Sequence, residues 1–373
     1  MPRNELRILL ITNGNRENKA DAVKNQKLSR ILQYFSKDVT LITFASKEEI
    51  ANVPKEKIVE LRDHHSRIVR ILYTQLALSL KILRIGRTGR IDRVVFAFGM
   101  DLQIMPVIAS KVVADRTIIR SDGRPSLVYE RYFHGHTRLQ RIVFKMIEEI
   151  DYRLADLVLT ECLYMIKDND LERYHAGVGG LFIDLSTFYP HTPIRDRKYD
   201  LGFIGRLSAA KGILNFLEAL ERLQTTFRVA IVGDGEIRDQ VLNGISHLRK
   251  LPGSNRLEID FHQWIDHEDL PDMLNEIKLL VVPSEKEGLP NIVIEAMACG
   301  TPVLATPVGG IPGIIEHKET GFIMRDNSPA CIADGILSAF SDDQLEHISA
   351  NGCSYAKMEF SPESTIQRWR GVI

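Results

Sequence analysis

The chain of 373 residues is long enough to form two domains of ordinary size, each with its own hydrophobic core. Its composition, 44% hydrophobic and 26% charged, is that of a soluble globular protein, and no run approaches the roughly 18 consecutive apolar residues that argue for a membrane span. The formal net charge of −1 conceals a contrast: residues 1–190 hold 30 Lys and Arg against 23 Asp and Glu, and the remainder holds 18 against 26. The two halves therefore suit different partners.

The cysteines are too few and too irregularly spaced for a disulfide framework or a zinc site. They are Cys162, Cys299, Cys331 and Cys353. This usage fits a reducing compartment, and residues 2–5 lead straight into an apolar run at residues 6–11 without a secretory signal. The sequence therefore predicts a cytoplasmic protein, either fully soluble or held at the inner face of the membrane.

The first half alternates short apolar runs with a helical pattern. Strands are expected at residues 6–11, 39–44, 93–98 and 117–120, and a helix at residues 18–35. Such alternation predicts an α/β fold with a parallel, doubly wound sheet. Because the first strand-to-helix loop of this fold approaches phosphate groups, Gly14 is a candidate for close backbone contact with a phosphate. An ordinary turn glycine is the alternative.

Residues 64–90 form a basic stretch without any acid. Its six basic residues are interleaved with leucine and isoleucine: Arg67, Arg70, Lys81, Arg84, Arg87 and Arg90. A basic, leucine-rich helix can lie on an anionic membrane surface, with its long cationic side chains reaching the headgroups. A core helix with basic ends would have the same composition, so both interpretations stand.

A proline-containing linker at residues 190–198 precedes a second expected sheet. Its strands are expected at residues 199–204, 227–232, 257–262, 279–283 and 302–305. The first strand ends in a loop that carries Arg206 and Lys211 beside the N-terminus of a helix. A forked guanidinium and a compact ammonium suit a diphosphate there, although a surface pair of basic residues is the alternative. Asp266 is expected to cap a helix at residues 267–277.

The most informative stretch is residues 279–307. A polar loop follows the strand, Pro290 opens a short helix, and Gly300 closes it. Leu289, the expected N-cap, offers no oxygen to the first helical N–H groups, which stay available to an oxygen-rich ligand. The carboxylates of Glu287 and Glu295 can accept paired hydrogen bonds from the vicinal hydroxyls of a sugar or ribose. A solvated loop acid and a glutamate favoured by the helix dipole are the alternative.

The order of residues in this stretch is specific. The run Glu287-Gly-Leu-Pro-Asn-Ile-Val-Ile-Glu295-Ala-Met-Ala-Cys-Gly300-Thr-Pro302 resembles the E-x7-E signature of family 4 glycosyltransferases, which are retaining enzymes of the GT-B fold. Residues 205–212 resemble the G-R-L-x-x-x-K-G segment of the same family. The resemblance covers residues 150–345 well and the first 150 loosely.

This resemblance implies two Rossmann-like doubly wound domains facing a cleft. Residues 1–190, with residues 354–373 crossing back, would form the N-terminal acceptor-binding domain. Residues 199–353 would form the C-terminal domain that binds the nucleotide-sugar donor. The last helix, with Ser361 as N-cap and Pro362 in its first turn, would return to the first domain.

The resemblance also implies roles for individual residues. The donor sugar would be held by Glu287, Gly288, Leu289, Pro290 and Asn291. The donor diphosphate would be held by Arg206 and Lys211 with Gly14, the ribose by Glu295, and the nucleobase by Trp264 and Ile265. Many family members have a sugar-contacting His near the strand end at residue 120. Asp122 stands there as a candidate catalytic substitute beside Glu287, or as a loop-capping Asp.

The sequence therefore predicts transfer of a hexose-type sugar from a nucleotide-diphosphate donor to a hydroxyl of a glycan, glycolipid or lipid-linked saccharide, with retention of configuration. The family implies no metal or other cofactor, and no nucleic-acid partner is expected. The basic first half favours an anionic or lipid-phosphate-linked acceptor. Two alternatives share the fold: a nucleotide-sugar epimerase or phosphorylase, and a non-catalytic partner protein, which the single Gly14 and the absent His would suit.

Overall fold

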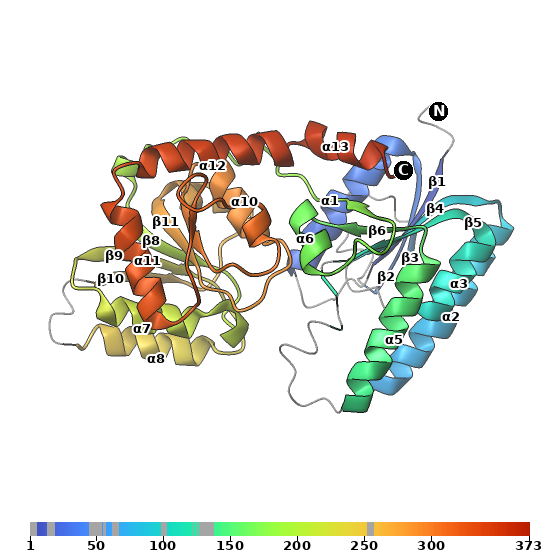
Figure 1. Ribbon diagram of the computed structural model, residues 1–373, viewed down its shortest axis with the longest axis horizontal. Helices are drawn as coiled ribbons and strands as arrows, with labels where there is room; N and C mark the ends of the chain where they lie inside the picture. Colours follow the sequence, from blue (N-terminus) through green and yellow to red (C-terminus); the bar gives the residue numbers. More distant parts are fainter. Residues whose placement is uncertain are drawn as a thin grey trace. The chain divides into compact units, whose positions relative to one another are not determined.

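The computed structural model describes residues 6–12, 19–44, 54, 57–61, 67–97, 103–121, 123–124, 126, 138–251 and 257–373; side chains 19–24, 67–71 and 141 are outside it. The chain divides into two compact units. Unit 1 is Met1–Leu181 with Thr365–Ile373, and unit 2 is Phe182–Ser364. Each unit holds one parallel sheet with helices packed on it (Figure 1).

The sheet of unit 1 has seven strands in the order β3-β2-β1-β4-β5-β6-β7. They are β1 Arg7–Thr12, β2 Asp38–Thr43, β3 Ile58–Glu60, β4 Ile91–Ala97, β5 Ala114–Arg120, β6 Leu157–Thr160 and β7 Ala176–Val178. All neighbouring pairs are parallel, and β1 pairs Leu9 with Thr40 of β2 and with Val94 of β4. Because helices cover both faces of such a sheet, its strands are near-continuous apolar runs, which is why the four strands expected here lie within three residues of observed ones.

The described helices of unit 1 are α1 Lys19–Phe35, α2 Arg67–Arg87, α3 Ile104–Val113, α5 Arg138–Leu154 and α6 Leu163–Asp168. The chain also contributes α13, Pro362–Arg370, whose residues from Thr365 onward belong to unit 1. Trp369 of α13 is fully buried there and donates from Nε1 to the carbonyl of Gly180 at 3.1 Å. The expected return of the last helix to the first domain is therefore confirmed.

The sheet of unit 2 has six parallel strands in the order β10-β9-β8-β11-β12-β13. They are β8 Tyr199–Ile204, β9 Phe227–Val232, β10 Leu257–His262, β11 Ile277–Val282, β12 Val303–Ala305 and β13 Phe322–Ile323. The helices are α7 Ile213–Arg222, α8 Arg238–Leu248, α9 Leu270–Asn275, α10 Asn291–Ala298, α11 Pro329–Ser341 and α12 Leu345–Phe360. The expected α/β class with two doubly wound sheets is confirmed.

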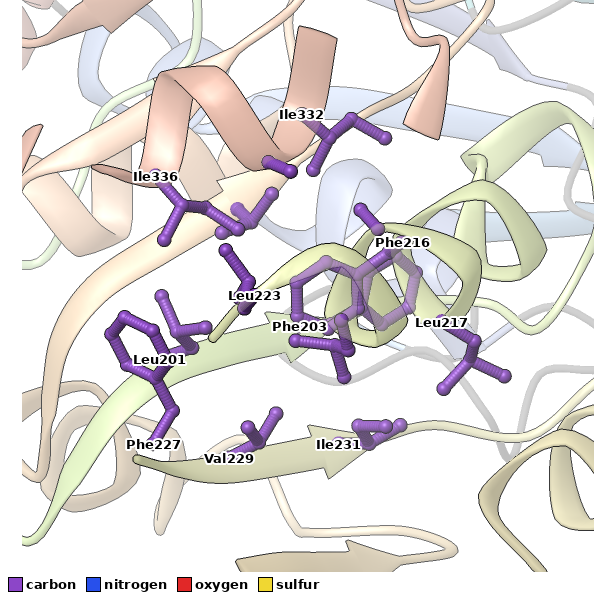
Figure 2. Close-up of a cluster of buried hydrophobic side chains, with 14 of the residues drawn as sticks. Leu201, Phe203, Phe216, Leu217, Leu223, Phe227, Val229, Ile231, Ile332 and Ile336 are labelled. Carbon is purple, nitrogen blue, oxygen red and sulfur yellow. The ribbon is translucent and has the colours of Figure 1, made fainter. Parts of the chain in front are cut away.

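One core of unit 2 lies between β8 and β9 of the sheet and the helices α7 and α11 (Figure 2). Phe203 of β8 stacks on Phe216 of α7 with ring centroids 6.1 Å apart. Ile332 and Ile336, one turn apart on α11, cover the same cluster. This core anchors the carboxyl end of β8, from which one of the candidate site loops departs.

Two expectations about helix starts in unit 2 are wrong. The helix expected at residues 267–277 is only α9, Leu270–Asn275, with Asp269 at its N-cap and a proline in its first turn. Asp266 instead accepts from Trp264 Nε1 at 3.3 Å. Helix α10 has Pro290 at its N-cap rather than Leu289, because the Pro290 backbone is still extended, with ψ 118°, and the first helical residue is Asn291.

The sequence places the domain boundaries at residues 190 and 354, whereas the two units divide after Leu181 and after Ser364. The segment between 182 and 198 packs within unit 2. Phe188 lies in one of its cores, and the buried Arg197 donates to the carbonyls of Ile277 and Cys299 at 2.8 and 3.0 Å. None of the helices in the described ranges is long and apolar enough to cross a bilayer.

Candidate functional site

The candidate site lies where the strand order of unit 2 reverses. From β8 the chain moves through β9 to β10 on one side, and β11, β12 and β13 then extend the sheet on the other. The loops after β8 and β11 consequently leave the same sheet edge in diverging directions. Open α/β sheets bind ligands in the crevice at this switch point. Residues 205–212 and 283–290 form these two loops.

An ion pair joins the two loops. Lys211 Nζ donates to Glu287 Oε1 at 2.6 Å, and the hydroxyl of Ser284 donates to the same oxygen at 2.7 Å. The Glu287 side chain is only 8% exposed, and that of Lys211 is 31% exposed. Oε2 accepts no hydrogen bond from the described residues, so this oxygen can receive a donor from a ligand. The structure thus brings together Lys211, which is predicted to bind the diphosphate, and Glu287, which is predicted to bind the sugar.

Two glycines permit the close packing of these loops. Gly212 has φ +70°, and a Cβ there would lie 2.0 Å from the carbonyl oxygen of Pro283. Gly309, in the loop after β12, has φ +59°, and its Cβ would lie 2.2 Å from the carbonyl oxygen of Glu287. Since a side chain at either position would push the loops apart, both glycines fix the place of Glu287.

Arg206 is exposed on the loop after β8. Its neighbour Leu207 ties the loop to the turn after β9 by donating to the carbonyl of Asp234 at 2.9 Å. Within the described ranges, the Arg206 guanidinium forms neither a hydrogen bond nor an ion pair. Lys286, on the loop after β11, adds a third cation, and burial lowers the pKa of its ammonium. The two loops therefore carry three cations, Arg206, Lys211 and Lys286, and two carboxylates, the nearly buried Glu287 and the exposed Glu285.

The N-terminus of α10 follows the second loop. Its N-cap, Pro290, offers no side-chain hydrogen bond, so the absence of a capping oxygen, which the sequence predicts, is confirmed. The side chains of Leu289 and Pro290 are buried, whereas Gly288 and Asn291 are half-buried. Gly288 accepts from the Gly310 N–H at 2.7 Å. Little of the Leu289 or Pro290 side chain is therefore open to a ligand.

Glu295 lies in the second turn of α10, and its side chain is 4% exposed. His267 Nε2 lies 3.2 Å from Glu295 Oε1, and the His267 ring packs on Phe188 at a centroid distance of 5.3 Å. Trp264 is 55% exposed in the same loop after β10, and Ile265 packs partly against the core. The structure therefore brings Glu295, which is predicted to bind the ribose, to the loop that carries Trp264 and Ile265, which are predicted to bind the nucleobase.

Sequence reasoning missed two residues of this arrangement. Ser284 stood in the polar loop at residues 284–289 but received no role. His267 carried no signal, because its contact with Glu295 spans 28 positions and depends on how β10 and α10 are placed. The predicted residues Gly14 and Asp122 lie outside the described residues. Beside Asp122, Arg124 is buried and forms an ion pair with Glu148.

Residues 187–353 match the family model of glycosyl transferases group 1. Unit 2 is a group 1 glycosyltransferase domain. Among curated relatives, D-inositol 3-phosphate glycosyltransferase of Xylanimonas cellulosilytica is 28% identical over 217 residues, which cover 54% of this chain and 51% of the relative. N-acetyl-alpha-D-glucosaminyl L-malate synthase of Bacillus anthracis is 35% identical over 144 residues, 38% of this chain and 36% of the relative. The chain thus spans about half or less of the length of these relatives.

A solved structure, Anabaena HepE in complex with UDP, resembles the chain with a TM-score of 0.75 and 18% identity, over 98% of this chain and 99% of that one. Sucrose-phosphate synthase from Thermosynechococcus elongatus follows with a TM-score of 0.72 and 17% identity, over 99% and 98% of the two chains. These likenesses show the GT-B fold. The four candidate residues Arg206, Lys211, Glu287 and Glu295 all lie inside the group 1 domain.

Proposed function

We propose that this protein is a retaining glycosyltransferase that moves a hexose-type sugar from a nucleoside-diphosphate donor to an acceptor hydroxyl. The contact between Lys211 and Glu287, at the switch point of a group 1 domain, carries the proposal. A nucleotide sugar presents an anionic diphosphate and a hydroxyl-bearing ring joined through one oxygen. A cation in contact with a carboxylate matches those two adjacent chemistries.

In the reaction, the bond between the anomeric carbon and the diphosphate oxygen breaks, and its electron pair stays on the diphosphate. Lys211 and the exposed Arg206 stabilise this growing negative charge, and the uncapped N-terminus of α10 favours it too. Gly14 of unit 1 is a further candidate for close approach to the diphosphate. These cations supply the counter-charge, so the proposal includes no metal or other cofactor.

Glu287 orients the sugar. Lys211 and Ser284 fix its Oε1, which leaves Oε2 to accept from donor hydroxyls together with backbone groups of residues 288–291. The acceptor oxygen forms its new bond to the anomeric carbon on the face that the diphosphate leaves, and the acceptor's proton passes to the departing diphosphate oxygen, so configuration is retained. Asp122 of unit 1 is proposed as the catalytic partner that accepts a hydrogen bond from a hydroxyl near this carbon.

Glu295 binds the ribose, because a nearly buried carboxylate gains more from two hydroxyl donors than an exposed one does. The exposed indole of Trp264 offers a flat surface to the nucleobase, and Ile265 supports it from the core. His267 holds Glu295 in place through the contact at 3.2 Å.

The acceptor is proposed to be a glycan, glycolipid or lipid-linked saccharide that carries negative charge. The basic first half supports this choice, because residues 1–190 hold 30 Lys and Arg against 23 Asp and Glu. Two relatives are named for D-inositol 3-phosphate and for L-malate, which are anionic compounds. The free cysteines support a reducing, cytoplasmic compartment.

The test is release of nucleoside diphosphate across a panel of nucleotide sugars with anionic acceptors. One donor should give turnover, and Lys211→Met or Glu295→Gln should lower kcat/KM by about 100-fold or more, as removal of a charge-stabilising group does. Lys250→Met and Glu319→Gln, at exposed positions of the same unit, are matched controls that should keep full activity. A chelator should leave the rate unchanged, and the anomeric proton of the product should show retention.

Other outcomes would replace this proposal. Donor binding without turnover across a broad acceptor panel would indicate a non-catalytic GT-B protein. Conversion of the donor sugar without an acceptor would indicate an epimerase, and transfer to inorganic phosphate would indicate a phosphorylase.

A further inference from the structure

Helix α2 has two apolar stripes, and only one of them is covered. Leu78 and Ile82 are fully buried in the core of unit 1. Leu72, Leu76 and Leu80 recur every fourth residue, so they share a face, and each is more than half exposed. Helix α2 is therefore a core helix, as one interpretation of the basic stretch has it, and it also presents leucines to the outside.

Two neighbouring helices repeat this pattern. On α3, Met105, Ile108 and Val112 follow the spacing of one helical face, and on α5 so do Met146 and Ile150; all five are at least 40% exposed. Leu139, Ile142 and Val143 extend the exposed stripe of α5 toward its start. Scattered exposed apolar residues need no explanation, whereas three adjacent stripes do.

The topology places the three helices on one side of the sheet. From β3 to β4, β5 and β6 the chain crosses the sheet in a single direction. Right-handed crossovers then put α2, α3 and α5 on the same face. Helix α3 packs against both α2 and α5, and Figure 1 shows the three running side by side. Their exposed stripes together are called the docking face.

The charge around the docking face is positive. Arg84 and Arg87 lie exposed in the last turn of α2, and Arg138 and Lys145 lie exposed on α5. None of these four forms an ion pair with another described residue. The acids of the three helices are all on α5. Two of them, Glu148 and Asp151, are fully buried, and Glu149 pairs with Arg153 at 2.8 Å.

We propose that the docking face binds the surface of a bilayer that contains anionic lipids. Leucine, isoleucine and methionine stripes can enter the boundary between headgroups and acyl chains, while long cationic side chains reach the lipid phosphates. A second copy of this chain is a poorer occupant, because a twofold contact through the same face would bring the arginines of one copy against those of the other. The proposal extends the expectation for residues 64–90 to α3 and α5.

The binding is tested without donor or acceptor, so its outcome is independent of the proposed function. The full chain is sedimented with phosphatidylcholine vesicles, with and without phosphatidylglycerol, at low and high salt. Binding should require phosphatidylglycerol and should weaken as salt shortens the range of the electrostatic attraction. Binding to neither vesicle, or equal binding to both, would overturn the proposal.

Two pairs of variants locate the surface. The double variant Leu139→Ser, Met146→Ser should partition onto the vesicles about tenfold more weakly or worse, because each substitution removes an apolar side chain from the bilayer boundary. Its matched control is Leu337→Ser with Met358→Ser, an exposed Leu and Met of unit 2, which should bind like the unmodified protein. Equal loss in both pairs would overturn the proposal.

The second pair tests charge. Arg84→Glu with Arg87→Glu should lower partitioning by at least about 25-fold, taking roughly fivefold for each basic residue near an anionic surface. Arg222→Glu with Lys250→Glu, at exposed positions of unit 2, is the control and should change binding little. Circular dichroism of each variant confirms folding. A dimer that forms without lipid and dissociates in the Leu139→Ser, Met146→Ser variant would overturn the proposal in favour of self-association.

Discussion

Asp151 makes the stability of unit 1 depend on pH in a direction opposite to most acids. The side chain is fully buried on α5. Its Oδ2 accepts from the Gln103 N–H, at the start of α3, at 2.6 Å, whereas Oδ1 has no hydrogen-bond partner among the described residues. Burial therefore raises the pKa of Asp151 from its ordinary 3.8 to about 7. We predict that Asp151→Asn stabilises the protein above neutral pH.

The sign follows from proton binding. The folded state holds the Asp151 proton more tightly than the unfolded state, so its stabilising effect is complete below about pH 4 and is lost as pH rises through 7. A difference of roughly three pKa units corresponds to about 4 kcal/mol, at about 1.36 kcal/mol per unit. Asparagine keeps the oxygen that accepts from Gln103 and never ionises, so the variant avoids this loss.

Urea unfolding followed by tryptophan fluorescence measures the effect. The sequence has two tryptophans, and Trp264→Phe leaves Trp369, which is fully buried in unit 1, as the reporter of that unit. In this background Asp151→Asn should raise the free energy of unfolding by about 2–4 kcal/mol at pH 8 and by less than about 1 kcal/mol at pH 4.5. An equal effect at both pH values would refute the reasoning.

Asp156 of the same unit provides a control of opposite sign. Burial opposes its ionisation, but hydrogen bonds from Lys111 Nζ at 2.6 Å and from the Thr117 N–H at 2.8 Å outweigh it and hold the pKa of Asp156 below its ordinary value. This carboxylate stabilises the fold above its unfolded pKa. Asp156→Asn should therefore destabilise unit 1 at pH 8, where Asp151→Asn stabilises it.

Three further predictions concern unit 2. Gly212→Ala would place a Cβ 2.0 Å from the carbonyl oxygen of Pro283 on a backbone with φ +70°. It should lower the midpoint of thermal unfolding and reduce the free energy of unfolding by about 2–4 kcal/mol. An unchanged midpoint would contradict the close approach. His267→Ala should raise the KM for the donor about tenfold, because Glu295 loses its contact with the imidazole and a net hydrogen bond to a charged group contributes roughly 1.5–3 kcal/mol. His267→Gln should restore the KM in steady-state kinetics. A thiol reagent should label half-buried Cys331 first in the native protein, as mass spectrometry would show.

The sheets were the most predictable part of the fold. Strands β8, β9 and β10 have the bounds that the sequence predicts, residues 199–204, 227–232 and 257–262. Each is a short apolar run ended by a turn signal. A parallel strand that is covered on both faces is apolar along its whole length, so such a run is enough to identify it. Helix starts were harder. Asp266 and Asp269 are both residue types that suit an N-cap. The sequence alone does not show which of them precedes the first turn of α9; the structure does, because it places Pro271 in that turn directly after Asp269 and Leu270.

The candidate site was predictable as a set of residues but not as a set of contacts. Two separate family segments identified Lys211 and Glu287, which are 76 positions apart, as neighbours of one ligand. Their direct contact follows from the strand order, which no local pattern encodes. The docking face shows the same limit. Both stripes of α2 are leucine-rich, so periodicity alone could not reveal which stripe the rest of unit 1 covers.

The contact between Lys211 and Glu287 resolves a conflict within the proposed site. A nearly buried carboxylate next to a diphosphate would repel it, and two like charges about 4 Å apart interact by roughly 4 kcal/mol at an effective dielectric constant near 20. Lys211 neutralises Glu287 before any donor arrives, while the second carboxylate oxygen stays open to a hydroxyl. Lys211 is therefore needed both to attract the diphosphate and to prevent Glu287 from repelling it. Its loss should weaken donor binding more than the loss of the more exposed Arg206.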